Sequence, residues 1–153
     1  MPEVGAPAPA FDLPADNGAR AIVPDPEGRA VVLYFYPKDD TTGCTREAQD
    51  FTALAAEFEA AGATVIGVSK DTVRKHDRFK AKYDLDVRLA SDEDGAVCEA
   101  WGVWVEKQLY GRKYMGIERA TFLIAGDGTV KQAWRKVSVA GHAQAVLDAA
   151  RAL

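Results

Sequence analysis

The chain has 153 residues, of which 48% are hydrophobic and 27% charged, and its formal net charge is −4 at pH 7. This length suits one domain with its own core, and we expect a single domain over residues 1–153. The acidic balance argues against a nucleic-acid partner, and no apolar run is long enough to span a bilayer. The N-terminal segment lacks the basic start and apolar stretch of a secretory signal, so we expect a cytoplasmic protein with no membrane partner.

The chain contains two cysteines, Cys44 and Cys98, and two histidines, His76 and His142. Two cysteines without a CxxC spacing are too few for a disulfide scaffold, and the four residues are too scattered for a zinc pattern. We therefore expect no metal and no organic cofactor. We expect both histidines to be solvated helix residues, and the chemistry of the chain to depend on a thiol.

The first thirty residues are rich in turn-forming residues, with short strands expected at residues 11–13 and 20–23. Residues 31–36 are a continuous apolar, β-prone run that ends at Pro37. Because apolar residues occupy successive positions, this run predicts a central strand that is covered on both faces.

Helical and extended patterns then alternate along the chain. The expected elements are a helix at 45–61, a strand at 64–69, a helix at 72–83, a strand at 87–90, a turn at 92–95, helical turns at 97–101, a strand at 120–124, a hairpin turn at 126–128 with its partner strand at 130–134, and a helix at 142–153. This order predicts an α/β fold with a central mixed sheet and helices on both faces. The first crossovers should be parallel, and the final hairpin should supply the antiparallel edge.

Cys44 lies where the polar loop after the central strand meets the start of a helix. Ligands of open α/β sheets bind beyond the carboxyl ends of strands, and helix N-termini present unpaired N–H groups there. The nucleophilic form of cysteine is the thiolate, which is only about 3% of a free thiol at pH 7. Making the thiolate dominant requires ~3.4 kcal/mol, whereas a helix terminus supplies ~1–2 kcal/mol. A nearby cation is therefore needed as well.

The surroundings of Cys44 also suit a peroxide, whose O–O bond must lie in line with the sulfur while donors hold its oxygens. The Thr41 hydroxyl is within reach by spacing, and the N–H groups of Gly43 and Cys44 are available. Gly43 also permits close approach. Pro37 has no N–H and can shield the sulfur from water.

The pattern Pro37-x-x-x-Thr41-x-x-Cys44 resembles the peroxiredoxin signature, and its flanks resemble the bacterioferritin-comigratory (Q-type) subfamily. The resemblance extends along nearly the whole chain, with similar segments at residues 34–39, 43–47, 91–95, 101–104 and 116–124. It implies a thioredoxin-like fold and a thiol-dependent peroxidase that reduces hydrogen peroxide and organic hydroperoxides through a sulfenic acid.

The resemblance also implies roles for single residues. Cys44 matches the peroxidatic nucleophile, and Thr41 matches the threonine that hydrogen-bonds thiolate and peroxide. Pro37 matches the shielding proline. Arg119 matches the arginine that stabilises the thiolate and polarises the peroxide, and it precedes a predicted strand from which it can enter the pocket. We assign Gly43 to substrate binding.

The chain departs from the family in two places. Thr42 stands where the family commonly has proline, and we expect it to cap the helix. Gln49 stands where many Q-type members carry the resolving cysteine, and the helix at 72–83 has no cysteine either. Cys98 is then either a packed core residue, as free cysteines often are, or the resolving thiol. We expect a one-cysteine cycle in which an external thiol reductant such as thioredoxin or glutaredoxin restores Cys44.

Other interpretations stay open at this point. A thioredoxin-fold redox sensor or binding protein could use Cys44 only as an oxidation switch, whereas the missing CxxC disfavours a disulfide reductase. The resemblance implies a monomer. Organic peroxides could enter along apolar side chains, for which the candidates are Tyr36, Phe51, Trp101 and Trp104.

Overall fold

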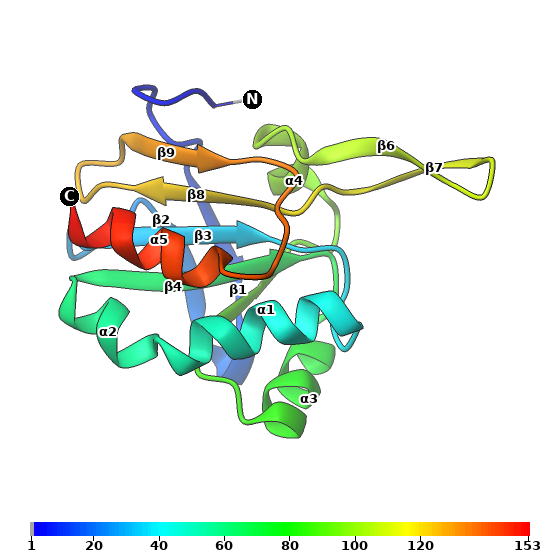
Figure 1. The fold of residues 1–153 in the computed structure, drawn as a ribbon, viewed down its shortest axis with the longest axis horizontal. Coiled ribbons are helices and arrows are strands. Elements are labelled where there is room, and N and C mark those ends of the chain that lie inside the picture. The colour runs from blue at the N-terminus through cyan, green and yellow to red at the C-terminus, as the bar shows by residue number, and fades with distance from the viewer. Residues whose placement is uncertain (1) are drawn as a thin grey trace.

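A five-stranded mixed sheet forms the centre of the computed structural model, which describes residues 2–153 (Figure 1). The strand order is β5 (Arg88–Ser91), β4 (Ala63–Ser69), β3 (Ala30–Phe35), β8 (Ala120–Ile124) and β9 (Val130–Trp134). Strands β3, β4 and β5 run parallel, whereas β8 is antiparallel to both β3 and β9. The predicted mixed sheet with an antiparallel edge is confirmed.

Strand β3 contributes to a core on each face of the sheet. Val31, Leu33 and Phe35 belong to one core, and Val32 and Tyr34 belong to the other. Successive side chains of a strand point to opposite faces, and both faces are covered here. This explains why the strand is apolar at nearly every position.

Helices cover both faces, as predicted. One core is closed by α1 (Thr42–Ala53), α2 (Ala55–Ala60), α3 (Val73–Tyr83) and α5 (His142–Arg151). The opposite core is closed by α4 (Ala96–Ala100) together with the hairpin of β1 (Phe11–Pro14) and β2 (Arg20–Val23), which a short 3-10 helix, η1 (Asp16–Gly18), connects. Within residues 2–153, no helix combines the length and apolarity that crossing a membrane requires.

Helix α1 differs from the prediction at both ends. It begins at Thr42, three residues earlier than expected, and it ends before Leu54, where the chain bends into α2. Thr41 holds the N-cap position with an extended backbone, and its carbonyl accepts the N–H of Thr45 at 2.8 Å. The expectation that Thr42 caps the helix is therefore wrong, because Thr42 already has helical backbone geometry. Cys44 is the third residue of α1 and lies inside its first turn.

A third hairpin, which the sequence pattern did not predict, projects from the body of the protein (Figure 1). It consists of β6 (Trp104–Leu109) and β7 (Arg112–Ile117), which pair only with each other. Tyr110 and Gly111 form the turn, and both have positive φ angles, of 50° and 77°. This is the geometry of a two-residue type I′ turn, whose strands follow the usual right-handed twist.

Candidate active site

Cys44 lies at the end of the sheet where β3 ends and α1 begins (Figure 1). Its side chain is 2% exposed and packs in the core beneath α1 and α5. Because the helix begins at Thr42, the N–H groups of Thr42, Gly43 and Cys44 have no acceptor within the helix. These groups and the helix dipole favour a negative charge at this position.

The guanidinium of Arg119 joins Cys44 to a buried glutamate. Its Nη2 donates to Cys44 Sγ at 3.2 Å, and its Nη1 donates to Glu47 Oε1 at 2.6 Å. Arg119 immediately precedes β8, and the register pairs Ala120 with Phe35, the last residue of β3. The antiparallel pairing therefore delivers the arginine to the loop that follows β3, which places a cation against the sulfur.

Gly43 allows this approach of the arginine. A Cβ atom at Gly43 would lie 3.2 Å from Arg119 Nη2, which is tighter than most such contacts. The backbone of Gly43 is ordinary helix, so proximity to the guanidinium, and not conformational freedom, favours glycine. Arg119 thus lies close to Gly43, and the role of Gly43 in substrate binding stays a prediction.

Thr41 and Pro37 lie on the loop that precedes α1, and both are exposed. The Thr41 hydroxyl donates to the carbonyl oxygen of Lys38 at 2.9 Å, and within residues 2–153 it makes no hydrogen bond to Cys44. A hydroxyl that donates one bond keeps lone pairs that can accept another, so Thr41 can still receive a peroxide O–H. Of the predicted site residues, the structure brings Arg119, Gly43 and Cys44 into direct contact.

Glu47 is a site residue that the sequence analysis missed. It follows Cys44 by three positions on α1, a spacing that puts two side chains on one face of a helix. It is only 1% exposed, and its second oxygen, Oε2, has no hydrogen-bond partner in the described part of the chain. Burial raises the pKa of Glu47 to about 7, although the charge of Arg119 opposes this shift. The helical spacing was the signal that could have identified it.

His76 anchors the loop that carries Thr41, which contradicts the prediction of a solvated histidine. It is fully buried, with Nδ1 2.7 Å from Asp39 Oδ2 and Nε2 2.9 Å from the carbonyl oxygen of Ala90. Tyr36 donates its hydroxyl to the other oxygen of Asp39 at 2.6 Å. Although α3 is rich in charged side chains, His76 faces inward because Asp39 and Ala90 offer it buried hydrogen-bond partners.

His142 is also buried, at 7% exposure, so the second histidine prediction is wrong as well. Its Nε2 lies 2.8 Å from Thr121 Oγ1, and its ring packs edge-on against Phe51 and Trp134. Burial and the charge of Arg119 lower the pKa of His142 to about 4. It is therefore neutral near pH 7 and adds no second positive charge to the site.

Cys98 lies in the core on the opposite face of the sheet and is 0% exposed. Its backbone N–H donates to Asp92 Oδ2 at 2.8 Å. Burial, followed by the neighbouring Asp92 carboxylate, raises the pKa of the Cys98 thiol well above its usual range. The structure thus separates the two thiols into different cores.

The proposed apolar entry for organic peroxides is not formed by three of its four candidates. Tyr36, Phe51 and Trp101 are each no more than 1% exposed and belong to the two cores. Trp104 is partly buried, with the Nζ of Lys70 4.2 Å from its ring centroid. Their large aromatic area is used for packing between sheet and helices.

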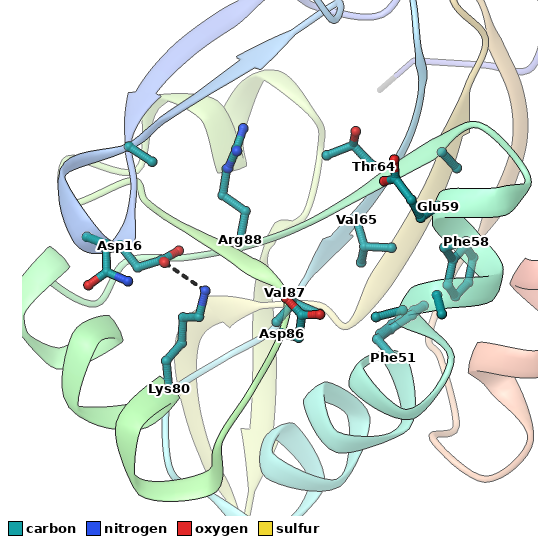
Figure 2. Close-up of a pocket in the computed structure, with 15 residues that line it drawn as sticks. Asp16, Phe51, Phe58, Glu59, Thr64, Val65, Lys80, Asp86, Val87 and Arg88 are labelled. Atoms are coloured by element: carbon teal, nitrogen blue, oxygen red, sulfur yellow. Dashed lines mark hydrogen bonds and ion pairs between the residues drawn. The ribbon is translucent and has the colours of Figure 1, made fainter.

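A cavity of about 550 Å³ lies between α2, α3 and the first residues of β4 and β5, and Phe51 is among the side chains that line it (Figure 2). Lys80 and Asp16 form an ion pair of 2.7 Å at its side, as the dashed line shows. The predicted catalytic residues Cys44, Thr41 and Arg119 do not line this cavity. Across residues 2–153, no group of three or more acidic, histidine or cysteine side chains is arranged to hold a metal ion.

Comparison with known proteins identifies the family of the chain. The sequence model of the AhpC/TSA family matches residues 4–133. The peroxiredoxin Bcp of Xanthomonas campestris is 51% identical over 148 residues, which cover 95% of this chain and 92% of that protein.

Solved structures indicate the same family. The bacterioferritin comigratory protein of Xanthomonas campestris, studied for its alkyl peroxide reduction activity, is 49% identical with a TM-score of 0.87, over 93% of this chain and 90% of its own. A cysteine variant of Xylella fastidiosa PrxQ is 38% identical with a TM-score of 0.93, over 99% of this chain and 97% of its own. These peroxiredoxins share the fold and the length of the chain. The chain therefore belongs to the AhpC/TSA family and is, within it, a peroxiredoxin of the Bcp (PrxQ) type.

Proposed function

We propose that this chain is a thiol-dependent peroxidase that reduces hydrogen peroxide and organic hydroperoxides, with Cys44 as the attacking nucleophile. The observation that carries the proposal is the 3.2 Å contact from Arg119 Nη2 to Cys44 Sγ at the start of α1. A thiolate is favoured where a guanidinium and unpaired helix N–H groups converge. The alkyl peroxide reduction studied in the Xanthomonas campestris relative supports an organic peroxide as one substrate.

The first half of the cycle is a displacement at oxygen. The Cys44 thiolate attacks the terminal oxygen of the peroxide, so an S–O bond forms while the O–O bond breaks. The sulfur is oxidised to a sulfenic acid, and the leaving oxygen departs with the electron pair and is protonated to water or an alcohol. Arg119 stabilises the thiolate and the charge on the oxygens. Thr41 accepts the peroxide O–H, and Gly43 keeps the arginine close to the sulfur.

Pro37 completes this proposed site by shielding the sulfur. It lies two residues after the end of β3 and has no N–H that could hold water beside the thiol. Glu47 acts as a positioning residue, because its 2.6 Å bond fixes the guanidinium that meets the sulfur. Both assignments concern groups around the reacting atoms and not the nucleophile itself.

The second half of the cycle follows a one-cysteine scheme in this proposal. Gln49 is exposed on α1, α3 has no cysteine, and Cys98 lies in the opposite core. Bringing Cys98 to Cys44 would require leaving that core and crossing the plane of the sheet. An external thiol therefore condenses with the sulfenic acid, and a dithiol reductant such as thioredoxin, or glutaredoxin, restores the thiolate by exchange.

The loop of the site is also fastened to α3, which supports a cycle without large local unfolding. His76 holds Asp39 at 2.7 Å, and Lys82 holds Asp40 at 2.8 Å. We further propose that residues 1–153 form a single domain, that the enzyme is a monomer, and that it works in the cytoplasm. A reducing compartment keeps both thiols free, as they are in this fold.

Peroxide consumption by Cys44→Ser, with Cys98→Ser as the matched control, tests the proposal. With a dithiol donor present, we expect Cys44→Ser to abolish multiple turnover and Cys98→Ser to retain it. Peroxide consumption by Cys44→Ser near the wild-type rate would overturn the proposal. A single slow oxidation per wild-type chain, without turnover, would instead identify a redox sensor.

A further inference from the structure

The side chain of Lys107, on β6, lies across the facing strand of its hairpin. It pairs with Tyr114 across the hairpin, and its aliphatic part lies over Gly116 of β7. A Cβ atom at Gly116 would lie 3.2 Å from Lys107 Cδ and 3.5 Å from its Cε. The φ angle of Gly116 is not in the left-handed region, so the lysine chain, and not the backbone, favours glycine here.

This path leads towards the base of the hairpin. Gly116 is followed by Ile117, Glu118 and Arg119, so a side chain that crosses Gly116 from Lys107 runs towards the site arginine. The hairpin projects from the end of the sheet at which α1 begins (Figure 1). The lysine is half-buried and lies within the electrostatic reach of three groups at that end: Arg119, Cys44 and Glu118.

The ammonium of Lys107 has no carboxylate partner among residues 2–153. The nearby carboxylates are paired elsewhere: Glu47 forms an ion pair with Arg119 at 2.6 Å, and Glu118 forms one with Arg135 at 2.6 Å. Burial and the charge of Arg119 lower the pKa of Lys107, while Cys44 and Glu118 oppose the shift. A half-buried cation that has no ion-pair partner among these residues, and whose side chain runs over Gly116 towards Arg119, is free to bind another group.

The reaction proposed above lacks a proton donor. The thiolate has already lost its proton, and a guanidinium stays protonated and does not give its proton up. Each terminal nitrogen of Arg119 already has one partner, Cys44 or Glu47, so its remaining N–H groups can stabilise charge on the oxygens but supply no proton. The leaving oxygen therefore needs a third group that can hydrogen-bond to it and protonate it.

We propose that Lys107 is a further catalytic residue, whose ammonium hydrogen-bonds to the leaving oxygen of a peroxide bound at Cys44 and gives it a proton. The inference rests on the proposed peroxidase function. Thiolate, hydroperoxide and ammonium are converted to sulfenic acid, alcohol and amine: the S–O bond forms, the O–O bond breaks, and the electron pair on the leaving oxygen takes the lysine proton. Water then returns a proton to the amine.

The test compares two classes of peroxide that differ in their need for a proton. The alkoxide that leaves tert-butyl hydroperoxide is strongly basic, whereas the acetate that leaves peracetic acid is stable without a proton. We expect Lys107→Met to slow Cys44 oxidation by the alkyl hydroperoxide roughly 10²-fold, in the range of general acid catalysis, and oxidation by the peroxy acid less than about threefold. Lys113→Met, on the exposed face of the same hairpin, is the matched control and should leave both rates unchanged.

Two further variants separate proton donation from charge. Lys107→Arg keeps the charge and a hydrogen-bond donor but gives up its proton poorly, so it should restore only part of the alkyl hydroperoxide rate. Gly116→Ala keeps the lysine but displaces its chain, so it should affect the same substrate in the same direction. Each rate is compared at equal thiolate fraction, measured from the ultraviolet absorbance of the thiolate.

Equal slowing of both peroxides by Lys107→Met, or no slowing of the alkyl hydroperoxide, would overturn the role of Lys107. Full restoration of the alkyl hydroperoxide rate by Lys107→Arg would show that only the positive charge matters, and this would also overturn proton donation. These outcomes leave the proposed function standing, because that function fails only if Cys44→Ser still consumes peroxide.

Discussion

Cys44 and Cys98 occupy similar positions in the fold, and the difference between them lies in their charged neighbours. Each is the third residue of a helix, α1 for Cys44 and α4 for Cys98, and each is at most 2% exposed. Cys44 meets the guanidinium of Arg119 at 3.2 Å, whereas Cys98 has the carboxylate of Asp92 as its neighbour. Burial alone disfavours a thiolate, so we expect the sign of the neighbouring charge to decide which of the two thiols is reactive.

The two helix starts also differ in what occupies them. Asp92 accepts the N–H groups of Val97 and Cys98, at 3.2 Å and 2.8 Å, so the start of α4 already holds an anion. The start of α1 has no side-chain cap, and its N–H groups are available to the sulfur and to a ligand. A helix N-terminus is thus useful for thiol chemistry only when no acidic side chain fills it.

The largest expected difference is in alkylation of the two thiols of the folded protein. At pH 7 we expect iodoacetamide to modify Cys44 roughly 10³-fold faster than Cys98, because the reaction requires a thiolate. Mass spectrometry of the peptides over time measures both rates in one sample. Comparable rates would show that the charged neighbours do not distinguish the thiols.

Removal of the site cation should have the next largest effect. We expect Arg119→Met to lower the thiolate fraction of Cys44 and to slow its oxidation by peroxide roughly 10²-fold, the usual effect of losing one charge-stabilising donor. Stopped-flow fluorescence follows the oxidation, and thiolate absorbance follows the ionisation. Arg46→Met, an exposed position of α1, is the control. An unchanged thiolate titration in Arg119→Met would remove the arginine from the site.

Glu47 makes the Cys44 environment sensitive to pH. As Glu47 ionises above about pH 7, its negative charge offsets that of Arg119, so the thiolate is less favoured. Gln keeps an oxygen that accepts from Arg119, so the guanidinium stays in position. We therefore expect Glu47→Gln to match the wild type at acidic pH and to be oxidised up to roughly tenfold faster well above pH 7. The pH profile of the oxidation rate measures this, with Glu57→Gln as an exposed control. Superimposable profiles for wild type and Glu47→Gln would contradict it.

The same carboxyl group should affect folding stability with a defined sign. Its pKa is raised from 4.5 to about 7 in the folded protein, so the folded state binds more protons between these values. This contribution to stability is complete below pH 4.5 and is lost as the pH rises through about 7. Urea unfolding of wild type and Glu47→Gln across this range gives an independent measurement of the shift.

The smallest expected effects follow from a substitution of Asp92, the neighbour of Cys98. Asp92→Asn keeps an acceptor for the N–H groups of α4 but removes the charge, so we expect a loss of about 1 kcal/mol in stability. Cys98 should then be alkylated several-fold faster, because a cause of its raised pKa is gone. Urea unfolding and peptide mass spectrometry measure the two effects, with Glu93→Gln as the exposed control. Slower alkylation of Cys98 would contradict the role assigned to Asp92.

The central strands could be predicted from the sequence because their side chains are buried on both faces. Strands β3 and β8 are apolar at almost every position, and that pattern has few other interpretations. The β6–β7 hairpin escaped prediction because its outer residues face water and carry no apolar alternation. The type I′ turn at Tyr110 and Gly111 was a weak signal, because tyrosine is uncommon where φ is positive.

The position of Cys44 could be predicted from the strand, loop and helix pattern, whereas its cation could be predicted only through resemblance to a family. Arg119 lies 75 residues from Cys44 in sequence, and the β3–β8 register that joins them cannot be obtained from spacing. His76 was misjudged for a related reason. A charged helix such as α3 suggests a solvated surface, and only the tertiary structure shows that Asp39 and Ala90 supply buried partners for the histidine.

The most direct test of the central claim, that Cys44 is the peroxidatic thiol, is to treat the reduced protein with one equivalent of peroxide. A diketone probe that captures sulfenic acid is present from the start, and peptide mass spectrometry identifies the modified residue. We expect the probe on Cys44 and a free thiol at Cys98. A probe adduct on Cys98 with Cys44 unmodified would contradict the account, and a Cys44–Cys98 disulfide would contradict its one-cysteine cycle.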